Sequence, residues 1–273
     1  MSQTEQATTR YIGLDLHKHY LIAVGLDEDL NPVLGPQRVP LSRLERWIQK
    51  TLLPTDQVAL EATTNAFRVY DELQPHVHSV TVVHPPHVAL ITRARVMTDR
   101  IAAQNLATLL AKGLLVSIWV PSAPQREVRG LVAQRNKMVR LSTQAKNRLH
   151  SLLHRHHIDP PDGSPFHLGH RDWWLRLPVS ELERIRIQCD LNALAFAQEQ
   201  IQSLDQAITL AAAEDDRVPI LVQLPGIAHL TAVTLLAAIG DISRFPSAKQ
   251  LVGYAGLGAR VHDSGQTRRT GRI

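Results

Sequence analysis

Short apolar runs alternate with helical patterns over the first 110 residues or so of the chain. Runs of β-branched and other apolar residues predict five strands, at residues 11–16, 20–26, 32–39, 57–60 and 79–83. Apolar residues at helical spacing predict three helices, at residues 41–53, 65–73 and 98–110. The first two strands follow each other so closely that we expect a tight hairpin, with Gly13 allowing another backbone to approach.

This order of elements resembles that of an RNase H-like (RuvC-like) α/β domain. In such a domain three antiparallel strands are followed by parallel strands that alternate with helices. We therefore expect this fold over residues 10–113. The Pro-rich segment 120–124 then marks a clear break before the next element.

Two long helical patterns occupy the middle of the chain. Apolar residues recur along residues 125–157 and again along 179–212, with a Pro- and Gly-rich loop at 158–170 between them. The first helix is basic and the second is nearly neutral. We therefore expect the two to pair as a long antiparallel coiled coil over residues 124–212, and such a pair can also hold two copies of the chain together.

A small helical C-terminal domain is expected over residues 217–273, so the chain combines an α/β part with an all-α part. Residues 221–240 have the outline of a helix-hairpin-helix, with the hairpin at the Pro-Gly-Ile triplet that begins at Pro225. Backbone N–H groups at the start of its second helix can hold a DNA phosphate. Ala228 stands where the usual pattern has a second glycine, so a plain helical turn in a small core is the alternative.

Composition and charge limit the kinds of partner and of binding site that this chain can have. The chain has 273 residues, 44% of them hydrophobic, and a formal net charge of +5, which suggests a polyanionic partner. Its single cysteine, Cys189, excludes a disulfide framework and a Cys-based zinc site, and favours a reducing cytosol. The polar N-terminus lacks the apolar core of a signal peptide, and no apolar run reaches the length of a membrane span. We therefore expect a cytoplasmic protein without a membrane partner.

Three carboxylates accompany the predicted strands. Asp15 lies inside the first strand, Glu61 at the C-terminal end of the fourth, and Asp99 at the start of the helix at 98–110. In an RNase H-like sheet the first strand lies beside the fourth, so these acids would converge on one cleft. Such a set of oxygen ligands suits Mg²⁺, and two such ions can activate an attacking oxygen and stabilise a leaving one. A turn cap for Asp15 and a helix cap for Asp99 are the structural alternatives.

The helix at 125–157 is basic almost throughout, and Glu127 is its only acid. It carries eight Lys or Arg residues: Arg126, Arg129, Arg135, Lys137, Arg140, Lys146, Arg148 and Arg155. A solvent-exposed helix usually mixes charges of both signs, so we expect this one to contact a nucleic-acid backbone, with plain solvation as the alternative. The first seven of these residues, together with Arg268 and Arg269 in the basic tail, are the candidate nucleic-acid contacts.

Six segments carry a family resemblance when they are taken together. They are GLDLHK, LEAT, MTDRIAAQNLA, the KNR-containing basic helix, LPGI followed by TAVTLLAAIGD, and RFPSAKQLVGYAGL. In this order and spacing, over about residues 10–273, they resemble the DEDD transposases of insertion sequences, the class that includes the Piv-type DNA invertases. The resemblance implies a RuvC-like N-terminal domain, a coiled coil and a C-terminal domain with a catalytic serine.

By this resemblance, Asp15, Glu61 and Asp99 are the first three acids of the family's metal site. The fourth acid is expected one helical turn after the third, in a TDxxDA pattern, but Ala102 stands there. Residues at i and i+3 lie on the same helix face, so two acids there could bridge a pair of metal ions. Ala102 therefore leaves one ligand missing.

Ser247 matches the nucleophilic serine of the family, and Ser243 is the less favoured choice. A serine in that position is otherwise most often a helix N-cap, and its hydroxyl is a weak nucleophile that needs activation. The resemblance assigns that activation to assembly of the serine with the metal site across subunits. The chain also stops inside a basic motif that continues in the family, so we expect the C-terminal domain to be truncated.

The predicted function is a DNA transposase or recombinase that exchanges strands through the acidic metal site and a serine–DNA intermediate. The resemblance implies that the protein binds DNA and forms a homo-oligomer (dimer or tetramer). In some members of the family a structured guide RNA also takes part. The expected location is the bacterial cytoplasm, beside the nucleoid. Ala102 and the early end predict weakened or absent catalysis. Two alternatives stay open: a catalytically decayed transposase that only binds nucleic acid, and an RNase H-like nuclease that uses carboxylates alone.

Overall fold

The computed structural model describes residues 9–86, 88, 98–213, 215–258, 261–264 and 267–270. The chain forms two compact units, which divide between Val120 and Pro121. This division falls in the predicted break at 120–124, and the further boundary expected near residues 212–217 stays a prediction. In the described part of the chain, no helix has both the length and the apolar character needed to cross a membrane.

A five-stranded sheet is the centre of the first unit. In chain order its strands are β1 (Tyr11–Leu16), β2 (Tyr20–Leu26), β3 (Pro32–Pro40), β4 (Gln57–Glu61) and β5 (Ser79–Val83). Their order across the sheet is β3-β2-β1-β4-β5, with β1, β2 and β3 antiparallel and β1, β4 and β5 parallel. The five predicted strands are confirmed, and their arrangement is that expected for an RNase H-like domain.

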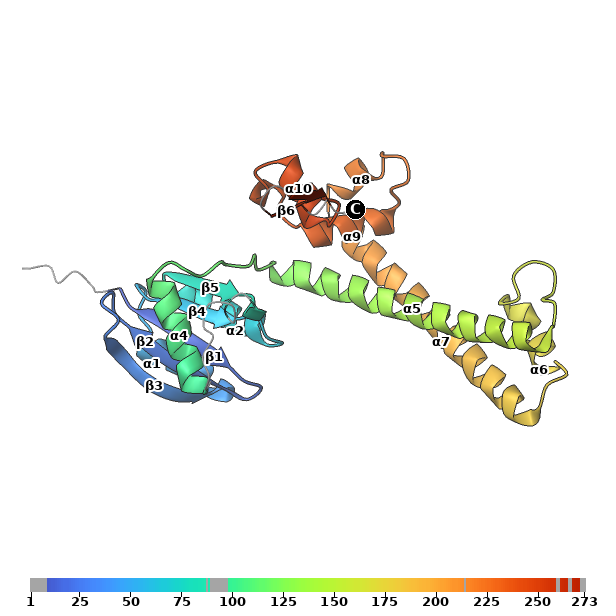
Figure 1. The fold of residues 1–273 in the computed structure, drawn as a ribbon, viewed down its shortest axis with the longest axis horizontal. Helices are drawn as coiled ribbons and strands as arrows, with labels where there is room; N and C mark the ends of the chain where they lie inside the picture. Colours follow the sequence, from blue (N-terminus) through green and yellow to red (C-terminus); the bar gives the residue numbers. More distant parts are fainter. Residues whose placement is uncertain are drawn as a thin grey trace, which may run out of the picture. The chain divides into compact units, whose positions relative to one another are not determined.

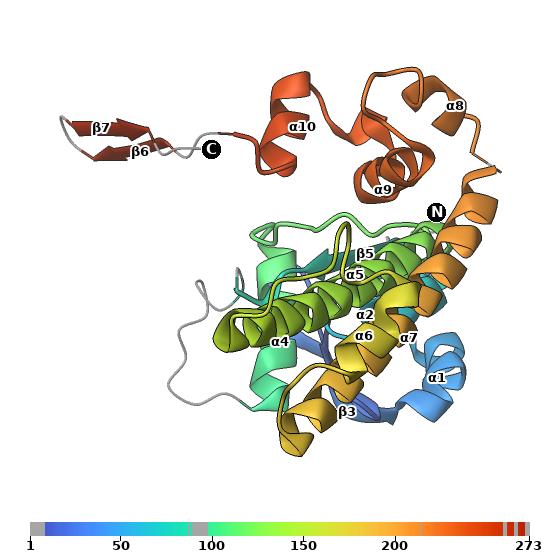
Figure 2. The same cartoon turned by 90° about the vertical axis from the view of Figure 1, so that its right-hand side faces the viewer.

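Helices cover both faces of this sheet. Those of one face are α1 (Leu44–Thr51), which follows η1 (Leu41–Arg43), and α2 (Ala66–Leu73), which continues into η2 (Gln74–His76). On the opposite face α4 (Asp99–Ala111) lies across β1 and β2 (Figure 1). Figure 2 shows α1 and α4 on opposite sides of the sheet.

Successive residues of β1 face opposite sides of the sheet. Its even-numbered residues belong to the core formed with α1 and α2, so Gly13 and Asp15 face α4. An added Cβ at Gly13 would overlap the backbone oxygen of Ala103 and lie 2.6 Å from the backbone nitrogen of Ala107. The predicted close approach at Gly13 is therefore confirmed, and the partner backbone is that of α4.

The second unit is framed by two long helices, α5 (Ala123–His156) and α7 (Glu181–Ala213). Arg148 of α5 pairs with Asp190 of α7 at 2.7 Å, and Arg155 pairs with Glu183 at 3.4 Å. Because the partner's number falls as the α5 number rises, the two helices run antiparallel. The predicted helices and their pairing are thus present, while a coiled-coil geometry stays a prediction.

The connection between these helices folds against their joined ends. It contains η3 (Leu168–His170) and α6 (Arg171–Leu175). Trp174 is buried there beside Leu153 and Ile187, and its indole Nε1 donates to the backbone oxygen of Pro165 at 2.7 Å. This tryptophan therefore packs the core of the second unit.

The C-terminal part of the second unit consists of short elements. They are α8 (Val218–Leu221), α9 (His229–Ile239), η4 (Ile242–Arg244), α10 (Ala248–Tyr254), β6 (Val261–Ser264) and β7 (Thr267–Thr270). Gly226 has a φ of +85° in the turn before α9, a conformation that favours glycine. Because α8 has only four residues, the helix-hairpin-helix outline stays a prediction. The β6–β7 hairpin lies where the sequence indicated only a basic, Gly-rich tail.

Candidate active site

The sheet register places Asp15 and Glu61 at the same level of two neighbouring strands. β1 and β4 are parallel, and Leu14 lies beside Leu60, so the next residue of each strand is one of the two acids. Ala59 packs in the core under α4, and Glu61, two residues further, therefore faces the same side of the sheet as Asp15. Two acids that are far apart in the chain thus share one edge of the sheet.

Asp99 reaches this edge from the first turn of α4. The cap of the helix is Thr98, whose side-chain oxygen accepts a hydrogen bond from the backbone nitrogen of Ile101 at 3.3 Å. The carboxylate of Asp99 is therefore not the capping group. One turn further along, the backbone of Ala103 touches β1 at Gly13, and this contact holds the start of α4 close to the strand.

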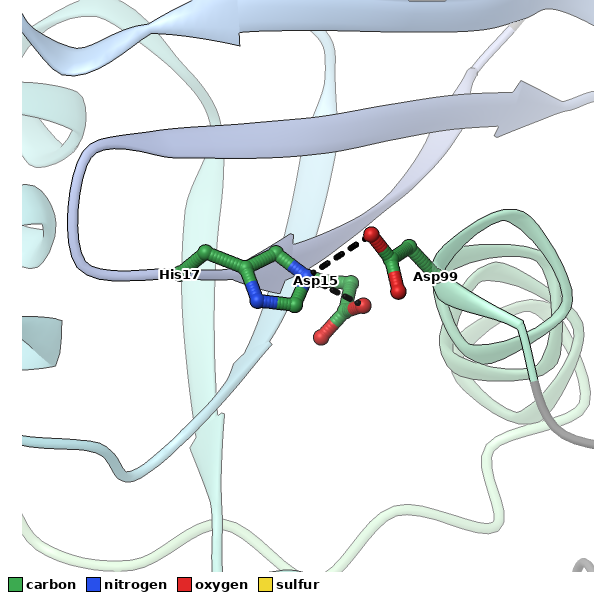
Figure 3. A group of neighbouring side chains, drawn as sticks. All are labelled: Asp15, His17 and Asp99. Atoms are coloured by element: carbon green, nitrogen blue, oxygen red, sulfur yellow. Dashed lines mark hydrogen bonds and ion pairs between the residues drawn. The ribbon is translucent and has the colours of Figure 1, made fainter.

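An imidazole joins the two aspartates. Figure 3 shows His17 at the end of β1 with its Nε2 atom directed at the carboxylates of Asp15 and Asp99. Nε2 lies 3.2 Å from Oδ2 of Asp15 and 3.1 Å from Oδ2 of Asp99. One ligand atom from each of the three side chains lies within 4.8 Å of the others. All three side chains are half-buried, so the cluster is both partly desolvated and reachable from solvent.

Tyr20 and Asn65 hold His17 in this place. The backbone nitrogen of His17 donates to the oxygen of Tyr20 at 2.8 Å and closes the β1–β2 hairpin. The Tyr20 ring stacks on the imidazole with centroids 4.5 Å apart, and its hydroxyl donates to Oδ2 of Asp99 at 3.0 Å. From the segment after β4, Asn65 Nδ2 donates to the backbone oxygen of His17 at 3.1 Å. The hairpin end is thus tied both to α4 and to the β4 side of the site.

Burial and mutual repulsion raise the pKa of two of the acids. The pKa of Asp15 lies above its ordinary value of 3.8, chiefly because burial disfavours the charged carboxylate; the charge of Asp99 adds to this, and His17 opposes it. The pKa of Glu61 lies above 4.5, first because of burial and then because of the charge of Asp15. Carboxylates that are desolvated and repel one another are stabilised when a cation enters between them.

The donor set of this site fits a divalent cation. Three carboxylates, those of Asp15, Glu61 and Asp99, offer the hard oxygen ligands that such ions take, and His17 offers one nitrogen. Ala102 lies on α4 one turn after Asp99, is half-buried, and offers no ligand atom. Ala102 therefore adds no fourth acid to Asp15, Glu61 and Asp99.

Ser247 belongs to the second unit. It is the N-cap residue of α10, its side chain is exposed, and its hydroxyl makes no capping hydrogen bond. The hydroxyl of Ser243, in contrast, donates to Oδ2 of Asp241 at 2.7 Å. At the other end of α10, Tyr254 donates to the backbone oxygen of Ala238 at 3.1 Å and fastens the segment to α9. Of the two serines, Ser247 has the hydroxyl more accessible to a substrate.

Several of the candidate nucleic-acid contacts have partners inside the second unit. Arg135 and Arg148 form ion pairs with aspartates of α7. Arg126 donates to the backbone oxygen before α5, and Arg129 donates to backbone oxygens of the last turn of α9. These four arginines therefore help to hold the unit together, whatever they do with a nucleic acid.

The other basic candidates differ in their surroundings. Lys137 and Arg140 are exposed on α5, and Lys146 is half-buried. Arg268 and Arg269 lie on β7, with side chains outside the part that the structure describes. Among the candidate contacts whose side chains the structure describes, Lys137 and Arg140 are thus exposed and without an ion pair to α7.

His17 and Tyr20 are residues of this cluster that were not predicted from the sequence. Both lie in the hairpin whose first strand carries Asp15, and His17 follows Asp15 by two residues, the period at which strand residues share a face. That spacing was the sequence signal that could have indicated His17 as a neighbour of Asp15. It was not sufficient to predict the contact, because the direction of a side chain just past a strand depends on the turn.

Two family models match the chain. A model of the DEDD transposases of the IS110 type, described as "Transposase", matches residues 12–158. A second, described as "Transposase IS116/IS110/IS902 family", matches residues 218–273. The first match contains the three acids, and the second contains Ser247.

Curated relatives extend over most of the chain. It is 23% identical over 266 residues to the transposase for insertion sequence element IS1111A of Coxiella burnetii, which covers 94% of this chain and 70% of the relative. It is 28% identical over 275 residues to the pilin gene-inverting protein of Moraxella bovis, with 93% and 74% covered. It is also 23% identical over 261 residues to the transposase for insertion sequence element IS1328 of Yersinia enterocolitica, with 93% and 75% covered.

These matches agree with the fold. The DEDD model covers more than half of the chain and includes α4 and the five-stranded sheet apart from its first residue, Tyr11. The relatives named as transposases and as a gene-inverting protein match along both units. The chain therefore belongs to the DEDD transposase family of the IS110 type and is a DNA transposase.

Proposed function

We propose that this transposase exchanges DNA strands with a divalent cation held by Asp15, Glu61 and Asp99 and with Ser247 as nucleophile. The observation that carries the proposal is the cluster of Asp15 and Asp99 with His17, beside which Glu61 lies at the level of Asp15 on the neighbouring strand β4. Mg²⁺ is the proposed cation because the donors are mainly carboxylate oxygens.

The protein's own part in this chemistry is to position charges. A bound divalent cation stabilises the negative charge that develops on phosphodiester oxygens during displacement. β1 and β4 hold Asp15 and Glu61 at one level, while the contact at Gly13 brings in α4 with Asp99. The hydroxyl of Tyr20 donates to Asp99 and fixes the direction of its carboxylate. Little rearrangement is therefore needed when a substrate phosphate arrives.

Ser247 is proposed to form the covalent bond to DNA. Its hydroxyl gives up a proton, the oxygen attacks a DNA phosphorus, and the bond from phosphorus to the departing deoxyribose oxygen breaks, with that oxygen taking a proton. Attack by the hydroxyl of another strand reverses these steps and restores the serine. The energy of the phosphodiester bond is kept throughout. The exposed hydroxyl of Ser247 supports this role, since the Ser243 hydroxyl is bonded to Asp241.

Ala102 is proposed to weaken catalysis with Mg²⁺. This ion dehydrates reluctantly and favours carboxylate oxygens, so three acids hold it less firmly than four. Ala102 is already on α4 one turn after Asp99. An aspartate at that position would therefore join the existing cluster.

Lys137 and Arg140, exposed on α5, are proposed to contact the phosphate backbone of DNA. A structured guide RNA, assembly into a dimer or tetramer, and a location beside the bacterial nucleoid complete the proposal. These last three parts rest on the family resemblance.

The test is an assay for a covalent protein–DNA adduct, using duplexes that carry the ends of the element from which the chain comes. The wild type, Ser247→Ala and Ser243→Ala are compared in Mg²⁺. We expect the adduct to disappear in Ser247→Ala and to persist in Ser243→Ala. We also expect a higher yield for Ala102→Asp, because it adds an oxygen ligand.

Each other outcome has a definite meaning. An adduct that persists in Ser247→Ala contradicts the assignment of the nucleophile. DNA cleavage without an adduct, equal in both serine variants, favours a nuclease that uses carboxylates alone. DNA binding without cleavage, even in Ala102→Asp, favours a protein that only binds nucleic acid.

A further inference from the structure

We infer that His17 is itself a ligand of the divalent cation and supplies, through Nε2, the coordination that Ala102 does not provide. This inference rests on the proposed cation site and identifies a nitrogen donor in it. It also predicts a different metal preference from that of a site made of carboxylates alone.

The separations between the donor atoms are those of neighbouring ligands around one ion. In an octahedral site with metal–ligand distances of about 2.1 Å, adjacent ligand atoms lie about 3.0 Å apart. Nε2 of His17 lies 3.2 Å from Oδ2 of Asp15 and 3.1 Å from Oδ2 of Asp99. The three atoms can therefore share one ion with the backbone in its present position.

The imidazole is held in this direction from two sides. Tyr20 stacks on the ring and donates to the same oxygen of Asp99 that Nε2 approaches (Figure 3 shows the three clustered side chains). Asn65 donates to the backbone oxygen of His17 and fixes the end of the hairpin. A side chain that is fixed before the metal arrives loses little entropy on binding. Metal binding needs a lone pair on Nε2, so the ring proton of the metal-bound form resides on Nδ1.

A nitrogen in place of an aspartate changes which cation the site prefers. Imidazole binds the later transition metals best, and Mn²⁺, although it also takes oxygen ligands, accepts an imidazole nitrogen more readily than the harder Mg²⁺ does. The neutral ring also leaves the site with one negative charge fewer than four carboxylates would give. The inference thus places the loss caused by Ala102 more on Mg²⁺ than on Mn²⁺.

The experiment titrates the full chain with Mn²⁺ and with Mg²⁺ by calorimetry, with and without a mixed-sequence DNA duplex. His17→Ala is compared with His19→Ala, which removes an exposed histidine from the same hairpin loop, outside the cluster. Loss of a ligand should cost at least as much as loss of a group that supports one, which is typically about 10- to 100-fold in affinity. We expect a loss of that size for Mn²⁺ in His17→Ala and no change in His19→Ala.

A measurement on the wild-type protein avoids any effect of a substitution on folding. Electron spin resonance of bound Mn²⁺ detects hyperfine coupling to a directly bound nitrogen, and labelling the histidines with ¹⁵N changes that coupling. We expect the nitrogen signal in the wild type and in His19→Ala, and its loss in His17→Ala. Thermal unfolding of each variant checks that the hairpin still folds.

A double substitution relates His17 to position 102. In an Ala102→Asp background the fourth acid is present, so His17→Ala should cost less Mn²⁺ affinity than it does in the wild type. An equal loss of Mn²⁺ affinity in both backgrounds would mean that the two positions act independently. It would overturn the inference that His17 compensates for the acid missing at position 102.

The remaining results separate this inference from the proposed function. Mn²⁺ binding that Asp15→Asn abolishes but His17→Ala leaves unchanged, without a nitrogen signal, overturns the inference and leaves the acidic cation site intact. Tighter binding in His17→Ala also overturns it, because the imidazole would then compete with the metal. Absence of any Asp15-dependent binding, even with DNA, overturns both.

Discussion

The acid cluster and the serine segment are built in opposite ways. Asp15, Glu61 and Asp99 lie on a sheet and a helix whose backbones touch, and their neighbours bond to one another. Ser247, in contrast, precedes a helix of seven residues, is exposed, and makes no capping hydrogen bond. One group of the proposed reaction is fixed in advance, and the other is left accessible.

The difference follows from what each group must do. Acids that share a cation need fixed separations, because they repel one another until it binds. The raised pKa values of Asp15 and Glu61 reflect first their burial and then that repulsion. A nucleophile has to reach a phosphate that arrives with the DNA, so exposure favours it.

The largest effect is expected from Gly13→Ala. The new Cβ would overlap the backbone oxygen of Ala103 and lie 2.6 Å from the nitrogen of Ala107, and a backbone cannot move aside as a flexible side chain can. We expect α4 to be pushed from β1, with a loss of about 3 kcal/mol or more in the free energy of unfolding and loss of cation binding. Chemical denaturation and calorimetry measure the two effects.

Gly35→Ala is the matched control for this prediction. Gly35 is also a strand glycine of the same sheet, and an added Cβ there would meet nothing within 4 Å. We expect its free energy of unfolding to change by less than about 1 kcal/mol. Similar losses in the two variants would show that the contact with α4 does not explain the effect.

A smaller effect is expected from removing exposed positive charge on α5. Lys137→Gln with Arg140→Gln removes two proposed phosphate contacts and should reduce the slope of log K against log salt by about 1.8. Between 50 and 200 mM salt the affinity for DNA would then fall about tenfold less than in the wild type. DNA binding measured by fluorescence anisotropy across that range gives the slope.

Arg135→Gln is the comparison for α5, because Arg135 is paired with an aspartate of α7. It should lower the stability of the second unit slightly and change the salt slope less than either exposed residue does. A larger change in slope for Arg135 than for Arg140 would contradict the contrast between paired and exposed basic residues. A flat salt response in the wild type would remove the proposed role of the helix.

The smallest effect concerns the pH dependence of stability. The pKa of Asp15 is raised in the folded state, so this group favours folding below its ordinary value of 3.8, and that contribution is lost as pH rises through the raised pKa. Without a metal ion, Asp15→Asn should therefore match the wild type at low pH and melt a few degrees higher near neutral pH. Thermal unfolding from pH 3 to 8 in a chelating buffer tests this.

Asp27→Asn is the control, because the pKa of Asp27 is shifted in the opposite direction to that of Asp15. Hydrogen bonds from Asn31 lower the pKa of Asp27, so its contribution to stability is present above its ordinary pKa value and is lost as pH falls. The Asp27 variant should therefore gain nothing near neutral pH. If both variants rise equally, removal of negative charge in general, and not repulsion at the site, explains the result.

The sequence predicted the sheet and the place of its acids because both depend on short-range patterns. Alternation along β1 and β4 determines which residues face α4, and the order of elements determines that the two strands are neighbours. The helix cap at Thr98 likewise depends on a short-range pattern, a threonine directly before the first residue of α4. These features need no knowledge of contacts between distant side chains.

The position of His17 and the partners of the arginines could not be predicted in the same way. His17 lies just past a strand, where the turn and the stacked ring of Tyr20 decide its direction. Arg135 and Arg148 lie in a helix that is basic along its whole length, and only the register of α5 against α7 shows which charges are neutralised. Net charge along one helix does not contain that register.

The contact at Gly13 also bears on how this domain can change over evolutionary time. The acid at the start of α4 is positioned by main-chain atoms one turn away, so many side chains along the helix can be exchanged without moving it. An insertion or deletion of one residue between Asp99 and Ala103 is different, because it turns the acid by about 100° around the helix axis. This part of the chain should therefore tolerate amino-acid substitutions far better than insertions or deletions.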